Sequence, residues 1–130
     1  MGTMTFQIPA DLPSEAVREL ERTCLAGGPG NMPYPTELQL TGKTLTLMRA
    51  VEDSGHLVAP WPVEGFGQLM GASATLAERP APYDLVVELA RGKVNQVRCQ
   101  AADWQTGGLQ LAADLEHRIE EASLTFGRAV

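Results

Sequence analysis

Two stretches of strict alternation between apolar and polar residues lie near the middle of the chain. Leu38 and Leu40 alternate with polar neighbours, and beyond the Gly42-Lys43 pair Leu45 and Leu47 do the same. Two alternating runs around a glycine-containing turn predict a β-hairpin. Because successive side chains point to opposite faces of a strand, we expect these four leucines to share one buried face.

Further short strands are expected on both sides of this hairpin. Alternation predicts one strand over residues 5–8 and another over residues 56–61, which Pro62 is expected to end. Residues 65–76 predict a weaker strand, because glycine and alanine are depleted in strands. Residues 26–31 are dominated by glycine and proline, which predicts a loop.

The hydrophobic period changes to that of a helix in the last part of the chain. From Val86 to Trp104 apolar residues recur at spacings of three and four, which predicts an amphipathic helix over residues 83–104. Gly107-Gly108 then turns the chain. A second helix is expected to carry its apolar residues on one face: Leu111, Leu115, Ile119, Ala122 and Phe126. The short connection predicts an antiparallel helical hairpin.

These elements predict one α+β domain over residues 1–130. Its β-rich part, over residues 5–79, is expected to form a small, sandwich-like antiparallel sheet. Its helical hairpin, over residues 80–130, is expected to cover that sheet. Each helix must bury its apolar stripe on the sheet, on the other helix or on a partner.

Composition narrows the function mainly by exclusion. The chain has 10 Lys and Arg against 16 Asp and Glu, a net charge of −6. An acidic chain without a basic stripe argues against nucleic acid and against a polybasic membrane anchor. The pattern of a signal peptide is missing, and so is an apolar run of about 18 residues, so a cytoplasmic protein is expected.

The residues that most often bind metals or carry out catalysis are few. Cys24 and Cys99 are interpreted as reduced thiols, although the sequence leaves their pairing open, and no metal or cofactor is expected. His56 follows Ser54-Gly55, but neighbours along a strand rarely face each other, so a polar turn is the favoured interpretation. No catalytic residue is assigned. Trp61 lies between two prolines, where it either packs under the bend or is displayed for stacking on a sugar.

The first predicted helix carries an unusual polar face. Glu88, Arg91, Asn95 and Arg98 recur at spacings of three and four, which places them on one side of the helix. This face is a candidate surface for a polar ligand or partner, and the alternative is an ordinary solvated face with weak ion pairs. Gly92, within the helix, costs about 1 kcal/mol relative to alanine, which indicates that another backbone approaches closely.

Six strings of residues follow one another from the middle of the chain onward: Ser54-Gly55, Pro60-Trp61-Pro62-Val63, Gly65-Phe66-Gly67, Ala74-Thr75-Leu76-Ala77-Glu78-Arg79, Pro82-Tyr83 and Val87-Glu88-Leu89-Ala90-Arg91-Gly92-Lys93-Val94-Asn95-Gln96-Val97-Arg98. Together they resemble the region that precedes the catalytic barrel in bacterial proteins of glycoside hydrolase family 10, the endo-1,4-β-xylanase class. The resemblance implies an accessory module, because the two catalytic carboxylates of that class belong to the barrel and no residue of this chain matches either.

Three functions therefore stand open, in this order. The first is a non-catalytic accessory module whose helices dock on a catalytic domain or on a second copy of the chain. The second is a carbohydrate-binding module in which Trp61 and neighbouring aromatic residues contact a polysaccharide. The third is a small enzyme that uses His56 or the polar face formed by Glu88, Arg91, Asn95 and Arg98.

Overall fold

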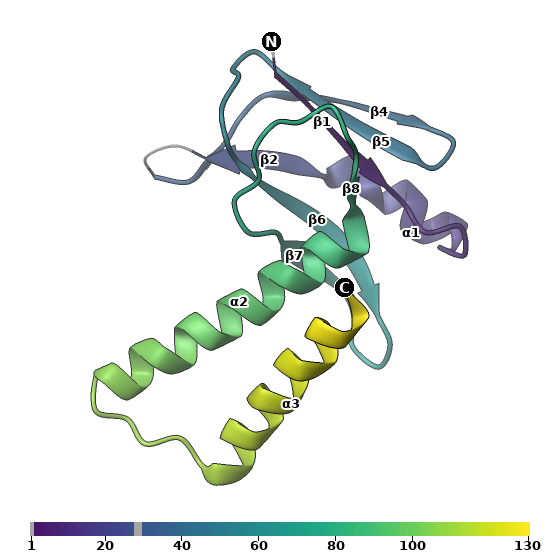
Figure 1. The fold of residues 1–130 in the computed structure, drawn as a ribbon. Coiled ribbons are helices and arrows are strands. Elements are labelled where there is room, and N and C mark those ends of the chain that lie inside the picture. The colour runs from purple at the N-terminus through teal and green to yellow at the C-terminus, as the bar shows by residue number, and fades with distance from the viewer. Residues whose placement is uncertain (1, 28–29) are drawn as a thin grey trace.

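The structure, a computed structural model, describes residues 2–27 and 30–130 (Figure 1). Its strands are β1 (Gly2–Gln7), β2 (Cys24–Gly27), β3 (Met32–Pro33), β4 (Thr36–Thr41), β5 (Thr44–Arg49), β6 (His56–Val63), β7 (Gly67–Ala72) and β8 (Tyr83–Asp84). Its helices are α1 (Ser14–Glu19), the 3₁₀ turn η1 (Leu20–Arg22), α2 (Leu85–Thr106) and α3 (Ala113–Ala129).

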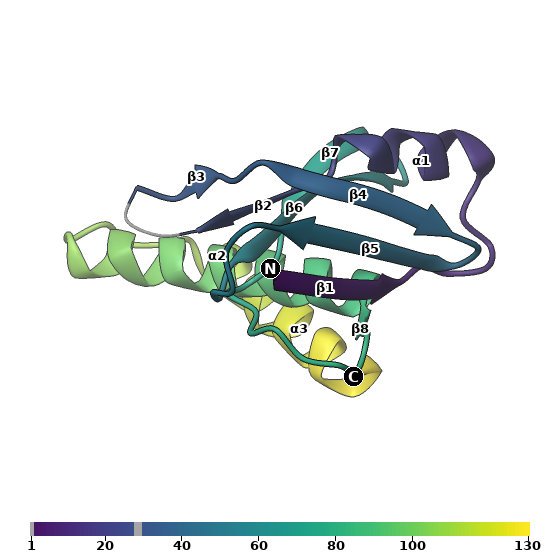
Figure 2. The same cartoon turned by 90° about the horizontal axis from the view of Figure 1, so that it is seen from above.

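In the described part of the chain the strands form two four-stranded sheets, ordered β4-β5-β1-β8 and β3-β2-β6-β7. Neighbouring strands are antiparallel, except that the short strand β8 runs parallel to β1. The view from above separates the first sheet from the helices, which lie beyond the second sheet (Figure 2). The predicted α+β class with a C-terminal helical hairpin is confirmed.

The predicted hairpin supplies one wall of the hydrophobic core. β4 and β5 pair in the register that sets Leu38 opposite Leu47 and Leu40 opposite Leu45. Leu45 and Leu47 are completely buried, whereas Leu40, near the end of the edge strand β4, is 37% exposed. The other core side chains come from β1, η1, β2, β6 and the start of α2, and the largest are Met4, Phe6, Leu20, Leu25, Leu57 and Leu85. The shared leucine face is therefore confirmed, with Leu40 at its rim.

The loop expected over residues 26–31 is wrong at its beginning, because β2 continues to Gly27. β2 pairs with β6 and sets Leu25 directly opposite Leu57 in the core. Local composition favours a loop here, but this long-range pairing satisfies the backbone and buries Leu25. Residues 28 and 29 of the expected loop lie outside the described residues.

The expectation that Pro62 ends a strand is also wrong. β6 continues through Pro60 and Pro62 to Val63 and pairs with β7 along this stretch. In the described residues β2 pairs with β6 only as far as Val58, so the proline-containing stretch has a strand on one side only. A proline has no N–H to donate, and it is tolerated where one side of a strand needs no partner. β7 itself is confirmed, although it is shorter than the predicted strand.

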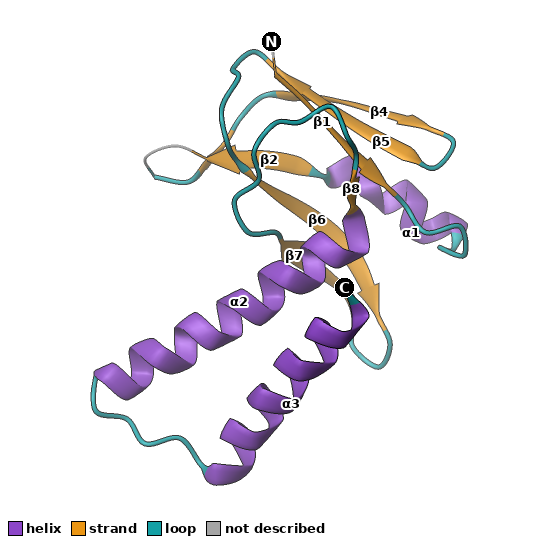
Figure 3. Ribbon diagram, viewed as in Figure 1, coloured by secondary structure: helices purple, strands orange, loops and turns teal. Residues whose placement is uncertain are grey.

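The helical hairpin does not cover the sheets, contrary to the sequence prediction. The buried residues of α2 all lie in its first turns, and the helix then extends away from the sheets (Figures 1 and 3). α3 returns alongside α2, and the chain end lies toward the sheets (Figure 1). The inner sheet faces already bury each other, and the outer face of β1 presents Thr3, Thr5 and Gln7. That polar face offers nothing for the apolar stripe of α3 to cover.

Candidate functional site

The base of α2 is held against the second sheet by direct backbone contact. A side chain at Gly92 would collide with the carbonyl oxygen of Ala72, and its Cβ would lie 2.7 Å from the Cα of Ser73. The close backbone approach that the sequence predicted at Gly92 is thus present. It fixes the direction in which α2 leaves the sheets.

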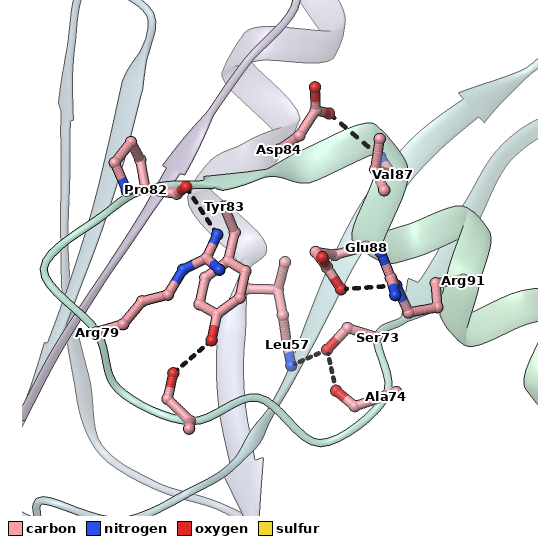
Figure 4. A network of polar contacts seen from close by, with 11 residues as sticks. Leu57, Ser73, Ala74, Arg79, Pro82, Tyr83, Asp84, Val87, Glu88 and Arg91 are labelled. Atoms are coloured by element: carbon pink, nitrogen blue, oxygen red, sulfur yellow. Dashed lines mark hydrogen bonds and ion pairs between the residues drawn. The ribbon is translucent and has the colours of Figure 1, made fainter. Parts of the chain in front are cut away.

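A small polar network surrounds this contact (Figure 4). The Ser73 hydroxyl, which is buried, accepts a hydrogen bond from the Leu57 N–H at 2.9 Å and donates one to the Ala74 carbonyl at 2.7 Å. The Tyr83 hydroxyl donates to the Ala77 carbonyl at 2.6 Å. These bonds tie the segment between β7 and β8 to both sheets, so the base of α2 rests on a well-connected platform.

Two residues of the predicted polar face come together in this region. Glu88 is buried, and its Oε2 lies 3.4 Å from Nε of Arg91, which is half exposed (Figure 4). The Arg91 guanidinium also lies over the ring of Phe126 on α3, with its Cζ 5.8 Å from the ring centroid. Asn95 and Arg98 follow along α2 and are exposed, so the structure does not join them to the Glu88–Arg91 pair.

The two remaining candidates lie on β6. His56 is half-buried at its first residue, and Trp61 is half-buried and packs against the hydrophobic core. Leu57 points into the core, so strand alternation places His56 on the opposite face of this sheet. α2 meets the inner face, where Gly71 lies against Leu89. His56 therefore does not face the Glu88–Arg91 pair.

Beyond Gly92 the two helices form an open arm, which we define as residues 93–129. No residue of α3 is buried, and the whole of α3 belongs to the described residues. Large apolar side chains of the arm remain in contact with solvent: Val97 is 40% exposed, Trp104 47% and Leu115 36%. Exposed apolar residues gathered on one surface indicate an interaction site.

Two grooves of opposite character run along the arm between α2 and α3. The polar groove, of about 540 Å³, contains Arg98, Glu116 and Glu120, and Gln105 Nε2 donates a hydrogen bond across it to Glu116 Oε1 at 2.9 Å. The apolar groove, of about 300 Å³, contains five large apolar side chains, which are Val97, Trp104, Leu111, Leu115 and Ile119. Its polar lining residues are Lys93, Gln96 and Gln100. The arm thus has one face suited to water and one suited to an apolar partner.

Sequence reasoning missed one buried charge, Arg49 at the end of β5. Its side chain is 1% exposed, its Nη2 lies 3.8 Å from Oε1 of Glu78, and its guanidinium lies over the Tyr34 ring at 5.4 Å. Its three nitrogens have no hydrogen-bond partner among the described residues. The signal was the alternation itself, since Arg49 continues the buried series of Leu45 and Leu47.

The remaining sequence expectations concern cysteines, metals and membranes. Cys24 is half-buried, Cys99 is exposed, and both are free thiols. Within residues 2–27 and 30–130 no three His, Cys, Asp or Glu side chains gather as metal ligands. The described helices include none that is long and apolar enough to span a membrane.

Comparisons with known protein families, with curated proteins and with solved structures give no match to this chain. The resemblance to the region that precedes a family 10 glycoside hydrolase barrel therefore stays a prediction from the sequence.

Proposed function

We propose that this chain is a non-catalytic self-association module, in which the apolar groove of the arm closes on the same groove of a second copy. The observation that carries the proposal is the state of α3, which buries none of its residues and yet lines a groove with Leu115 and Ile119. A helix in water gains most of its stability from burying an apolar face.

A second copy supplies the missing burial with the fewest new elements. Each arm contributes two antiparallel helices, and two arms stacked by their apolar grooves complete a four-helix bundle. Such a contact is isologous, because the same surface serves on both copies, and closed two-fold dimers are the commonest assemblies of soluble proteins.

The distribution of charge within the arm supports this choice of partner. The chain carries a net charge of −6, which by itself opposes self-association. The apolar groove avoids this repulsion, because Lys93 is the only charged residue in its lining. Glu116 and Glu120 lie along the polar groove instead. Two copies can bring their apolar grooves together without opposing carboxylates.

The resemblance noted in the sequence favours the same kind of role. It implies an accessory module beside a glycoside hydrolase, and the connection with sugar chemistry rests on that resemblance alone. Docking on a catalytic domain is the competing use of the arm. A second copy is preferred here because one self-complementary groove explains the exposure of both helices.

Light scattering over a range of concentrations tests the proposal. We expect the wild-type chain to approach twice its mass of 14.0 kDa and Val97→Asp to stay at 14.0 kDa, because the variant places a charge in the apolar groove. Asn95→Asp is the matched control: it adds the same charge at an exposed position of the same helix, outside the lining of the apolar groove. A wild-type chain that stays monomeric, or two variants that associate equally, would overturn the proposal.

A further inference from the structure

We infer that Arg91 is a positioning residue for the arm: it holds α3 against α2 and thereby sets the width of the apolar groove. The inference deepens the proposed function and rests on it for its biological meaning. The contact itself, between Arg91, Glu88 and Phe126, is testable whether or not the chain associates.

α2 has its direction fixed by the sheets. Leu85, Glu88, Leu89 and Gly92 are buried at its base, and Gly92 lies directly on the backbone at Ala72 and Ser73. A helix held by backbone contact and by two core leucines cannot turn about its axis without losing that packing. α2 is therefore the fixed half of the arm.

α3 lacks an anchor of this kind. Its contacts with the rest of the fold are made chiefly with α2, and its most protected side chains are only half-buried. Chain connectivity holds its first end, through the short segment 107–112 that joins the helices. The other end, near the chain terminus, needs a contact of its own if the groove is to keep a constant width.

Arg91 provides that contact. It lies one residue before Gly92, where α2 leaves the sheets, and its guanidinium lies over the ring of Phe126 in the last turns of α3. On its other side Arg91 pairs with the buried Glu88, whose carboxylate restrains the guanidinium from the fixed base of α2. The chain of contacts from Glu88 through Arg91 to Phe126 thus connects the platform of the sheets with the free end of α3.

The nature of the arginine side chain is part of the inference. A planar guanidinium stacks on an aromatic face and pairs with a carboxylate at the same time, whereas a lysine ammonium is a point charge on a flexible stem. Arg91→Lys keeps the charge and loses the stacking geometry. We therefore expect it to restore the function of Arg91 in part.

Hydrogen exchange of the α3 amides is the direct test. We expect Arg91→Ala to accelerate exchange over α3 by about two- to fivefold, the range of an exposed cation–π contact, and to weaken dimerisation by a similar factor. Arg98→Ala is the matched control, two turns further along the same helix and exposed. Phe126→Leu serves as the second variant, because it removes the ring and leaves Glu88 and Arg91 paired.

The outcomes separate the two proposals. If Arg91 positions α3, Arg91→Ala and Phe126→Leu have the same effect, and the double variant adds nothing to either. If both variants exchange as slowly as Arg98→Ala while the chain still dimerises, the inference about Arg91 is overturned and the proposed function stands. If the wild-type chain is monomeric but Arg91→Ala still loosens α3, the proposed function is overturned and the positioning role of Arg91 stands.

Discussion

Replacing Gly92 by alanine gives the sharpest test of how α2 is attached to the sheets. In an isolated helix this change is favourable by about 1 kcal/mol, because glycine is a poor helix former. In this structure the added Cβ would meet the Ala72 carbonyl oxygen and would lie 2.7 Å from the Cα of Ser73. Both obstacles are backbone atoms, which cannot rotate away as a side chain could.

The magnitude follows from weighing these two effects. Overpacking a well-filled contact costs about 1–3 kcal/mol, and a backbone obstacle belongs at the upper end of that range. The gain in helix propensity offsets about 1 kcal/mol of it. We expect a net loss of about 2 kcal/mol in the free energy of unfolding. For a chain of this size that loss lowers Tm by about 7 °C.

Gly127→Ala is the matched control, because it makes the same change within α3. A Cβ at Gly127 has nothing within 4 Å among the described residues, so only the propensity effect remains. That effect is stabilising by about 0.5 kcal/mol or less, since the last turn of a helix is frayed. Thermal unfolding followed by circular dichroism compares the two variants with the wild-type chain.

A result of opposite sign would refute this reasoning. If Gly92→Ala raised Tm as Gly127→Ala is expected to do, the backbone contact between α2 and β7 would not exist in solution. The arm would then have no fixed half, and its description as a rigid projection from the sheets would fail.

Two further predictions concern the sheets and the start of α2. Arg49→Leu leaves the buried Oε1 of Glu78 without its counter-charge, so we expect a loss of about 3 kcal/mol in urea unfolding that Arg49→Leu combined with Glu78→Leu largely restores; equal losses in both variants would contradict this role of the pair. Asp84→Ala removes the cap that accepts the Val87 N–H at 3.2 Å, and we expect a loss of about 1 kcal/mol, whereas Asp84→Asn should stay near the wild-type value.

The sequence predicted elements where the signal was local. The β4–β5 hairpin follows from two alternating runs and from Gly42, which adopts a positive φ of 60° at the turn. The course of α2 follows from its apolar period, and the contact at Gly92 follows from the presence of a glycine within a helix. Each of these conclusions needs only a few neighbouring residues.

Other features depend on partners that are distant in sequence. β2 exists because Leu25 pairs opposite Leu57, and Arg49 is placed in the interior together with Glu78, which lies in the segment between β7 and β8. For the helices, an apolar stripe shows which face favours burial and leaves open what will cover it. The expected covering of the sheet by α3 failed for this reason. The sequence likewise did not show that His56 and Glu88 belong to different faces.

Self-association through the apolar groove is the central claim, and the solution mass of two leucine variants tests it most directly. Leu115 lines the apolar groove, whereas Leu124 is exposed on the polar-groove side of the same helix. We expect light scattering to give a dimer for the wild-type chain and for Leu124→Asp, and a monomer of 14.0 kDa for Leu115→Asp. If Leu115→Asp remains a dimer, or if Leu124→Asp alone becomes a monomer, the apolar groove is not the surface that joins two copies.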